Sequence, residues 1–180
     1  MSCKRSFAAL MWSSLFASGA LAQTVWHVDD DATAPGNGSV AQPFPDIASA
    51  VASSVSSDTI LVENGDYVGF SFAGKNVAVR SVNGKSHVQV LGALPSGNTV
   101  EIAAGEGPGA VLDGFTVYGD VAGVGYGGGY ALWVDGAAPT VRNCDFLGGG
   151  YSSNGVRVAT PATGPGVLFE DVAVTNFDHQ

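Results

Sequence analysis

The sequence is poor in cysteine and in basic residues. Its two cysteines are Cys3 and Cys144, and Cys3 falls in an N-terminal segment that is predicted below to be removed. A single remaining thiol excludes an internal disulfide, so the fold must depend on a packed core. Seven Lys and Arg face 16 Asp and Glu, a net charge of −9. This balance argues against nucleic acid and anionic membranes as partners, because both bind basic patches.

Long apolar runs are also missing, except near the N-terminus. Lys4 and Arg5 precede a mostly apolar stretch, residues 7–16, and Ala20-Leu21-Ala22 has the A-x-A form of a cleavage site. The pattern predicts a secretory signal peptide over 1–22, cleaved near Ala22, and a secreted or cell-surface protein. A membrane anchor is disfavoured because the run is too short to span a bilayer comfortably. We therefore expect no membrane insertion.

Helical periodicity is scarce as well, and the chain instead repeats a strand, a two-residue corner and a second strand. The repeat occurs at 111–117, 139–146 and 168–174. Its corners are Asp113-Gly114, Arg142-Asn143 and Glu170-Asp171. Aligned on the corner, the apolar residues form three columns: Leu112, Val141 and Phe169; Phe115, Cys144 and Val172; Val117, Phe146 and Val174.

The second of these columns steps by 29 and then 28 residues. A fixed period of this size is typical of a solenoid. Because the repeating unit is a strand and a turn, we predict an all-β chain, a parallel β-helix of about four to five coils. It forms a single domain over 23–180, in which Cys144 is a buried apolar residue.

One helix is expected before the first coil. Asp46 is suited to cap it, and Ile47, Ala50, Val51 and Val55 recur on one face. It ends in the Ser-rich stretch 53–57, and it should cover the open end of the core. Further strands are expected at 25–28, 58–63, 77–80, 88–90, 100–102, 130–134 and 155–158, with turns at 64–66, 83–84 and 96–98.

Three of these strands also align with one another. Their inward residues are Val100 and Ile102, Leu132 and Val134, and Val156 and Val158. Alternation then places Glu101, Trp133 and Arg157 outward on one face, in successive coils. A carboxylate, an aromatic ring and a guanidinium in this order suit a sugar-binding groove, which Tyr126, Tyr130 and Tyr151 would extend. The alternative is that Trp133 packs under the Gly-rich loop 119–129 as part of the core.

Several segments resemble one known group. They are Trp26 to Asp31, Pro43 to Ile47, Asp58 to Val62, Asn64 to Tyr67, Lys75 to Val79, Gly127 to Tyr130 and Pro139 to Phe146. Together they resemble the right-handed parallel β-helix proteins of the pectin-lyase-like superfamily, over essentially all of 25–177. The resemblance implies the fold. It leaves the activity open, since the superfamily includes lyases, hydrolases, epimerases and adhesins.

The enzyme signatures that the resemblance suggests are missing from the sequence. There is no Gly-His-Gly segment, no pair of Asp residues on a coil strand, and no carboxylate cluster to hold Ca²⁺ beside Arg142 or Arg157. We therefore predict a non-catalytic module that binds polysaccharide or a cell-surface partner. The alternative is a polysaccharide lyase or glycoside hydrolase of which this chain is a short or truncated copy.

No cofactor is predicted, and the weak alternative is Ca²⁺ at Asp29, Asp30 and Asp31, since hard cations prefer carboxylate oxygens. Three consecutive carboxylates are not expected to face one ion, which favours a solvated loop. His27, His87 and His179 share no metal-ligand spacing.

The sequence shows no capping element after the last core strand. An open solenoid edge invites pairing with another chain. We expect either a fragment of a longer protein or association through this C-terminal end.

Overall fold

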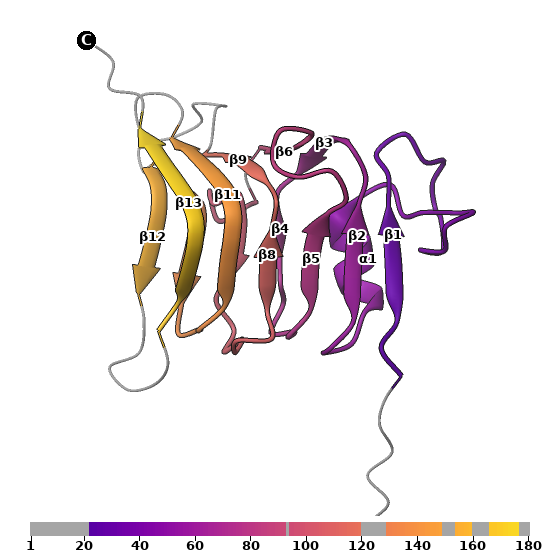
Figure 1. Cartoon of the computed structure of the whole chain (residues 1–180), viewed down its shortest axis with the longest axis horizontal. Coiled ribbons are helices and arrows are strands. Elements are labelled where there is room, and N and C mark those ends of the chain that lie inside the picture. The colour runs from indigo at the N-terminus through magenta and orange to yellow at the C-terminus, as the bar shows by residue number, and fades with distance from the viewer. Residues whose placement is uncertain (1–21, 93, 120–128, 149–153, 160–165, 177–180) are drawn as a thin grey trace, which may run out of the picture.

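The computed structural model describes residues 22–92, 94–119, 129–148, 154–159 and 166–176. These residues form one short helix and a series of strands that stack along one axis (Figure 1). The elements are β1 (Val25–Val28), α1 (Ile47–Ser53), β2 (Thr59–Val62), β3 (Gly65–Val68), β4 (Phe70–Ser71), β5 (Ala78–Ser81), β6 (Val88–Leu91), β7 (Val100–Ile102), β8 (Val111–Asp113), β9 (Thr116–Tyr118), β10 (Tyr130–Asp135), β11 (Thr140–Gly148), β12 (Asn154–Ala159) and β13 (Leu168–Asn176). Within this part of the chain, no helix is long and apolar enough to cross a membrane.

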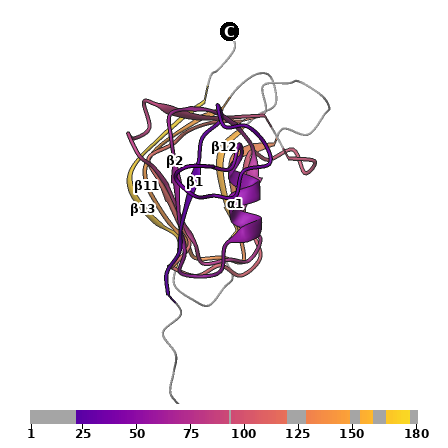
Figure 2. The same ribbon diagram turned by 90° about the vertical axis from the view of Figure 1, so that its right-hand side faces the viewer.

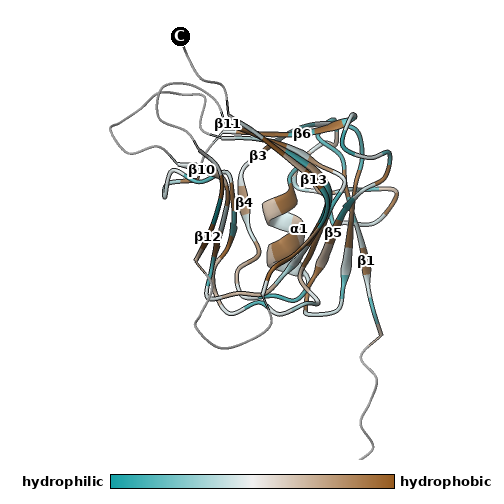
Figure 3. Cartoon of the chain, turned by 60° about the vertical axis from the view of Figure 1, so that its left-hand side comes forward, coloured by the Kyte–Doolittle hydropathy of each residue, from teal (hydrophilic) through white to brown (hydrophobic). Residues whose placement is uncertain are grey.

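Every strand pairs in parallel with the strand at the same place in the next coil. The first side of the coil stacks β1, β2, β5, β8, β11 and β13 in that order. The second stacks β3, β6 and β9 onto the C-terminal part of β11, and the third stacks β4, β7, β10 and β12. This is the parallel β-helix that the sequence predicted, its coils have three sides, and the predicted strands all lie within it (Figures 1 and 3).

The corner repeat is confirmed in register. Val141 is aligned with Leu112 on one side and Phe169 on the other, and Phe146 with Val117 and Val174. The corner is made by one residue with left-handed backbone in each coil: φ is 88° at Gly114, 52° at Asn143 and 49° at Asp171. Asn and Asp tolerate this conformation better than other residues with a Cβ. Strands β11 and β13 continue through the corner, whereas β8 and β9 are separate strands on either side of Gly114 and Phe115.

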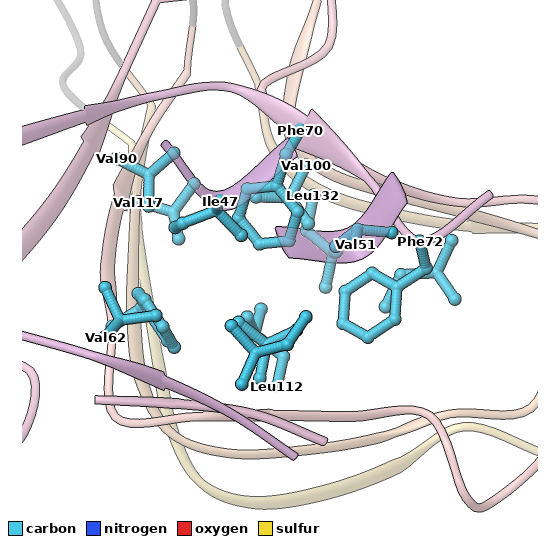
Figure 4. Packing of buried hydrophobic residues seen from close by; sticks show 14 of the residues in the cluster. Ile47, Val51, Val62, Phe70, Phe72, Val90, Val100, Leu112, Val117 and Leu132 are labelled. Carbon is cyan, nitrogen blue, oxygen red and sulfur yellow. The ribbon is translucent and has the colours of Figure 1, made fainter. Parts of the chain in front are cut away.

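The aligned apolar residues fill the interior. Val62, Phe70, Val90, Val100, Leu112, Val117 and Leu132 meet there from the three sides (Figure 4). In the last coil the inward residues are uncovered, and Phe169 and Val174 are 39% and 51% exposed. Val158, predicted to be inward, is likewise 39% exposed, because β12 ends its sheet.

Helix α1 packs against the N-terminal end of this core, at one side of the coil, with Ile47 and Val51 beside Phe70 and Val100 (Figures 2 and 4). The side chain of Asp46 caps it by accepting the Ser49 N–H at 2.7 Å, as predicted. Ile47, Ala50 and Val51 are buried. At its other end, the Nζ of Lys75 donates to the last carbonyl groups of the helix segment, those of Val51, Ala52 and Ser54, at 2.5–2.9 Å.

Three details differ from the sequence prediction. Val55 is 53% exposed rather than part of the helix face, because the helix ends at Ser53. The turn predicted at 64–66 is wrong in its second half, since Gly65 and Asp66 pair in parallel with β6. Strand β4, only two residues long, was not predicted.

Candidate ligand-binding surface

The outward residues of the third side form a ladder along the coil stack. Ser71 is aligned with Glu101, Glu101 with Trp133, and Trp133 with Arg157. The alignment of Glu101, Trp133 and Arg157 is therefore the one expected from the sequence. Ser71, Glu101, Trp133 and Arg157 belong to β4, β7, β10 and β12, respectively. The residues just before the first three, Phe70, Val100 and Leu132, point into the core and are fully buried.

Trp133 lies at the centre of an aromatic and cationic cluster. The Arg157 guanidinium carbon is 4.9 Å from the centre of the Trp133 ring and 5.7 Å from that of Tyr130. The two rings are 5.5 Å apart and tilted by 53°. Arg157 also donates to the Tyr130 hydroxyl at 3.3 Å. The Arg157 guanidinium therefore covers part of the aromatic surface. Trp133 nevertheless remains partly exposed.

Glu101 is fixed by a residue that the sequence reasoning missed. Asn98 is buried and donates from Nδ2 to the Glu101 carboxylate at 2.8 Å, while its Oδ1 accepts the Tyr130 N–H at 3.1 Å. Asn98 therefore joins the carboxylate to the strand that carries the aromatic residues. Its only sequence signal was its place at the end of the 96–98 turn.

The surface presents three kinds of group that can bind a ligand: a guanidinium, a carboxylate and aromatic rings. Arg157 is exposed, and its one side-chain hydrogen bond among the described residues is the bond to Tyr130. A guanidinium suits the carboxylates and hydroxyls of sugars, a carboxylate suits their hydroxyls, and ring faces suit their apolar faces. Tyr126, Tyr151 and most of the loop 119–129 lie outside the described residues.

Asp29, Asp30 and Asp31 lie closer together than expected. One oxygen of each carboxylate is within 4.8 Å of the others, although three consecutive carboxylates were not expected to face one ion. The Ca²⁺ alternative stays a prediction. Two of them have structural roles. Asp29 accepts the Asp31 N–H at 3.1 Å, and Asp30 accepts the Asp66 N–H at 2.9 Å. The three carboxylates could supply oxygen ligands to Ca²⁺, and these two hydrogen bonds explain the cluster equally well.

The other candidate residues are scattered. His27 lines a shallow hollow of about 350 Å³ together with Asp29, Asp31, Val40, Pro43, Glu63 and Asn64. His87 lies elsewhere, with Nδ1 3.1 Å from the Asn83 carbonyl oxygen, and His179 is outside the described residues. Arg142 is paired with Asp113 at 2.9 Å. None of these, in the described part of the chain, joins the Trp133 cluster.

Cys144 is fully buried. Burial disfavours the thiolate and raises the pKa of the thiol to about 11, despite partial compensation from backbone groups of Phe115 and Gly114. A thiol with this pKa is not an activated nucleophile.

No protein-family model matches the chain, and no curated protein matches it in sequence. Among solved structures it resembles a crystal structure of pectin methylesterase, an aspartate-to-alanine mutant in complex with hexasaccharide IV. The TM-score is 0.57 at 17% sequence identity, over 86% of this chain. The chain spans about half of that structure, 50% of its length. The likeness, with the parallel stacking of its own strands, shows that this chain has the right-handed parallel β-helix fold of the pectin-lyase-like proteins.

Proposed function

We propose that the mature chain is an exported, non-catalytic β-helix module that binds polysaccharide on the outer surface of β4, β7, β10 and β12. The observation that carries the proposal is the cluster of Tyr130, Trp133 and Arg157, with the guanidinium carbon 4.9 Å from the Trp133 ring centre. A polysaccharide running along the coil axis would meet Glu101, Trp133 and Arg157 in turn. Strands in a sheet are about 4.8 Å apart, so each recognition group is one such step from the next.

The fold likeness supports this class of ligand. The pectin methylesterase structure was solved with a hexasaccharide, so one protein of this fold binds an oligosaccharide of several units. At 17% identity the likeness shows the fold alone, and it carries no residue role to this chain.

The neighbours of Glu101 favour binding over catalysis. Glycoside hydrolysis uses two carboxyl groups that flank the bond to be cleaved. Glu101 is aligned with Ser71 and Trp133, neither of which is a carboxylate. Its own carboxylate accepts a hydrogen bond from Asn98. The competing proposal is a polysaccharide lyase or glycoside hydrolase, and product formation distinguishes it.

The test is binding of the chain 23–180 to labelled hexasaccharides from plant, algal and bacterial polysaccharides. We expect at least one to bind, and Trp133→Ala to weaken that binding about tenfold or more, since aromatic anchors contribute about 1.4 kcal/mol or more in such sites. Arg157→Ala should weaken binding to acidic sugars more than to neutral ones. Tyr118→Ala, at an outward aromatic residue of β9 on the second side, serves as the matched control.

Equal affinities for wild type and Trp133→Ala would overturn the proposed surface. Release of shortened sugars, or of sugars with unsaturated ends, would instead establish an enzyme.

A further inference from the structure

The free edge of β13 leaves the inward columns of the core uncovered. Val141, Cys144 and Phe146 of β11 are fully buried, whereas Phe169 and Val174, aligned with the first and last of them, are 39% and 51% exposed. In the described part of the chain, β13 pairs with β11 alone. Its opposite edge therefore presents unpaired backbone groups beside apolar side chains, in the register that every other coil interface uses.

The outward column beside this edge alternates in charge from coil to coil. Arg80 of β5 is aligned with Asp113, Asp113 with Arg142, and Arg142 with Glu170. Within the column, the Arg142 Nε is 2.9 Å from the Asp113 carboxylate. Glu170 is exposed and forms no ion pair among the described residues. The next position in the alternation is therefore one for a cation.

From the continuity of these columns we propose that the edge of β13 binds an extended segment of a different protein. The segment lies parallel to β13, with apolar side chains over Phe169, Val172 and Val174 and a Lys or Arg in register with Glu170. This is strand addition to an open sheet edge: backbone hydrogen bonds supply affinity and the side-chain columns supply specificity. The inference is independent of the sugar-binding proposal, which concerns the third side of the coil.

A second copy of the chain fits this edge less well. At the N-terminal end, the outer edge of β1 is already bonded to the 38–44 segment: the His27 N–H donates to the Gly38 carbonyl, and the His27 carbonyl accepts the Phe44 N–H. Two copies can therefore pair strand to strand only through β13, edge to edge. That contact is two-fold and antiparallel, and it brings two sets of Glu170 and Asp171 together with no cation. The charge of the edge favours a basic partner.

The probe is a nine-residue peptide with the sequence of residues 140–148, carrying Cys144→Val to prevent disulfide formation. This sequence already packs against β13 on its other edge, with Val141 over Phe169, Arg142 beside Glu170 and Phe146 over Val174. Binding of the fluorescently labelled peptide to the chain 23–180 is measured by anisotropy, beside the same peptide with its Arg142→Glu.

We expect the arginine peptide to bind about fivefold more tightly than the glutamate peptide, the size of a cross-strand charge effect. Glu170→Lys in the protein should reverse this preference, whereas Asp66→Lys, a charge reversal on exposed β3, should leave it unchanged. Val174→Pro, which disrupts the edge, should abolish binding of both peptides.

Failure of the arginine peptide to bind, or a preference that Glu170→Lys does not reverse, would overturn the proposal. Sedimentation equilibrium gives a further test. A dimer that Val174→Pro dissociates would show that a second copy occupies the edge, and it would overturn the proposal.

Discussion

Asp58 joins three segments that are distant in the sequence. Its carboxylate accepts hydrogen bonds from the Thr24 N–H, the Trp26 indole and the Val55 N–H at 2.8–2.9 Å. Burial alone would raise the pKa of this carboxyl, but these hydrogen bonds outweigh burial, and the pKa lies below its usual value. The ionised form therefore holds β1 and the segment after α1 to the start of β2.

We predict that Asp58→Asn destabilises the fold by about 2 kcal/mol, since hydrogen bonds to a charged group are lost and, in either orientation, the amide N–H₂ faces at least one N–H donor. Because the pKa is lowered in the folded state, the stability that wild-type Asp58 contributes is present above about pH 4 and is lost as the pH falls through the lowered value. Urea unfolding between pH 3 and pH 7 measures it. The difference between wild type and variant should shrink at the acidic end, and a constant difference would contradict the assignment.

The buried thiol of Cys144 gives a second prediction at this scale. Since its pKa is raised to about 11 and the side chain is fully buried, the folded protein should not react with an aromatic disulfide reagent at pH 8. In guanidinium chloride, the one thiol of the chain 23–180 should react within minutes. Rapid reaction of the folded protein would contradict the placement of Cys144 in the core.

At the scale of elements, an inward residue of an inner coil should contribute more to the free energy of unfolding than one of the last coil. Phe115→Ala and Phe146→Ala each remove a fully buried ring, so we expect losses of about 3–5 kcal/mol in the free energy of unfolding. Phe169→Ala, in the same repeat but 39% exposed, should cost about 1 kcal/mol, because less apolar area is returned to water. Guanidinium chloride unfolding compares the three. Equal losses would mean that β13 is covered in solution.

The sequence was sufficient for the elements that repeat. The 29- and 28-residue steps identified the coil, and Asp46 identified the start of α1, because both depend on local spacing. Strand β4 was missed because two residues carry no periodicity. The exposure of Phe169 and Val174 was missed for a different reason: spacing shows which way a side chain points and not whether another coil covers it.

For the molecule as a whole, the candidate surface was only partly predictable. The alignment of Glu101, Trp133 and Arg157 followed from strand alternation. The stacking of Arg157 on both rings did not, because it depends on contacts between side chains 24 and 27 positions apart. The bridge through Asn98 did not either, because it includes a contact with Tyr130, 32 positions away. The same holds for the approach of Asp29, Asp30 and Asp31, which depends on how the loop bends.

The parallel stacking of the strands also has a mechanical consequence. Hydrogen bonds between coils run along the long axis of the molecule, because each strand pairs with its counterpart in the next coil. Tension along this axis therefore loads the coil interfaces in series, and the rod extends by peeling one coil at a time. Tension across the axis loads the interfaces side by side. Within the interface that joins β2, β3 and β4 to β5, β6 and β7, the two-residue pairing of β4 with β7 is the shortest, so the third side is its weakest part.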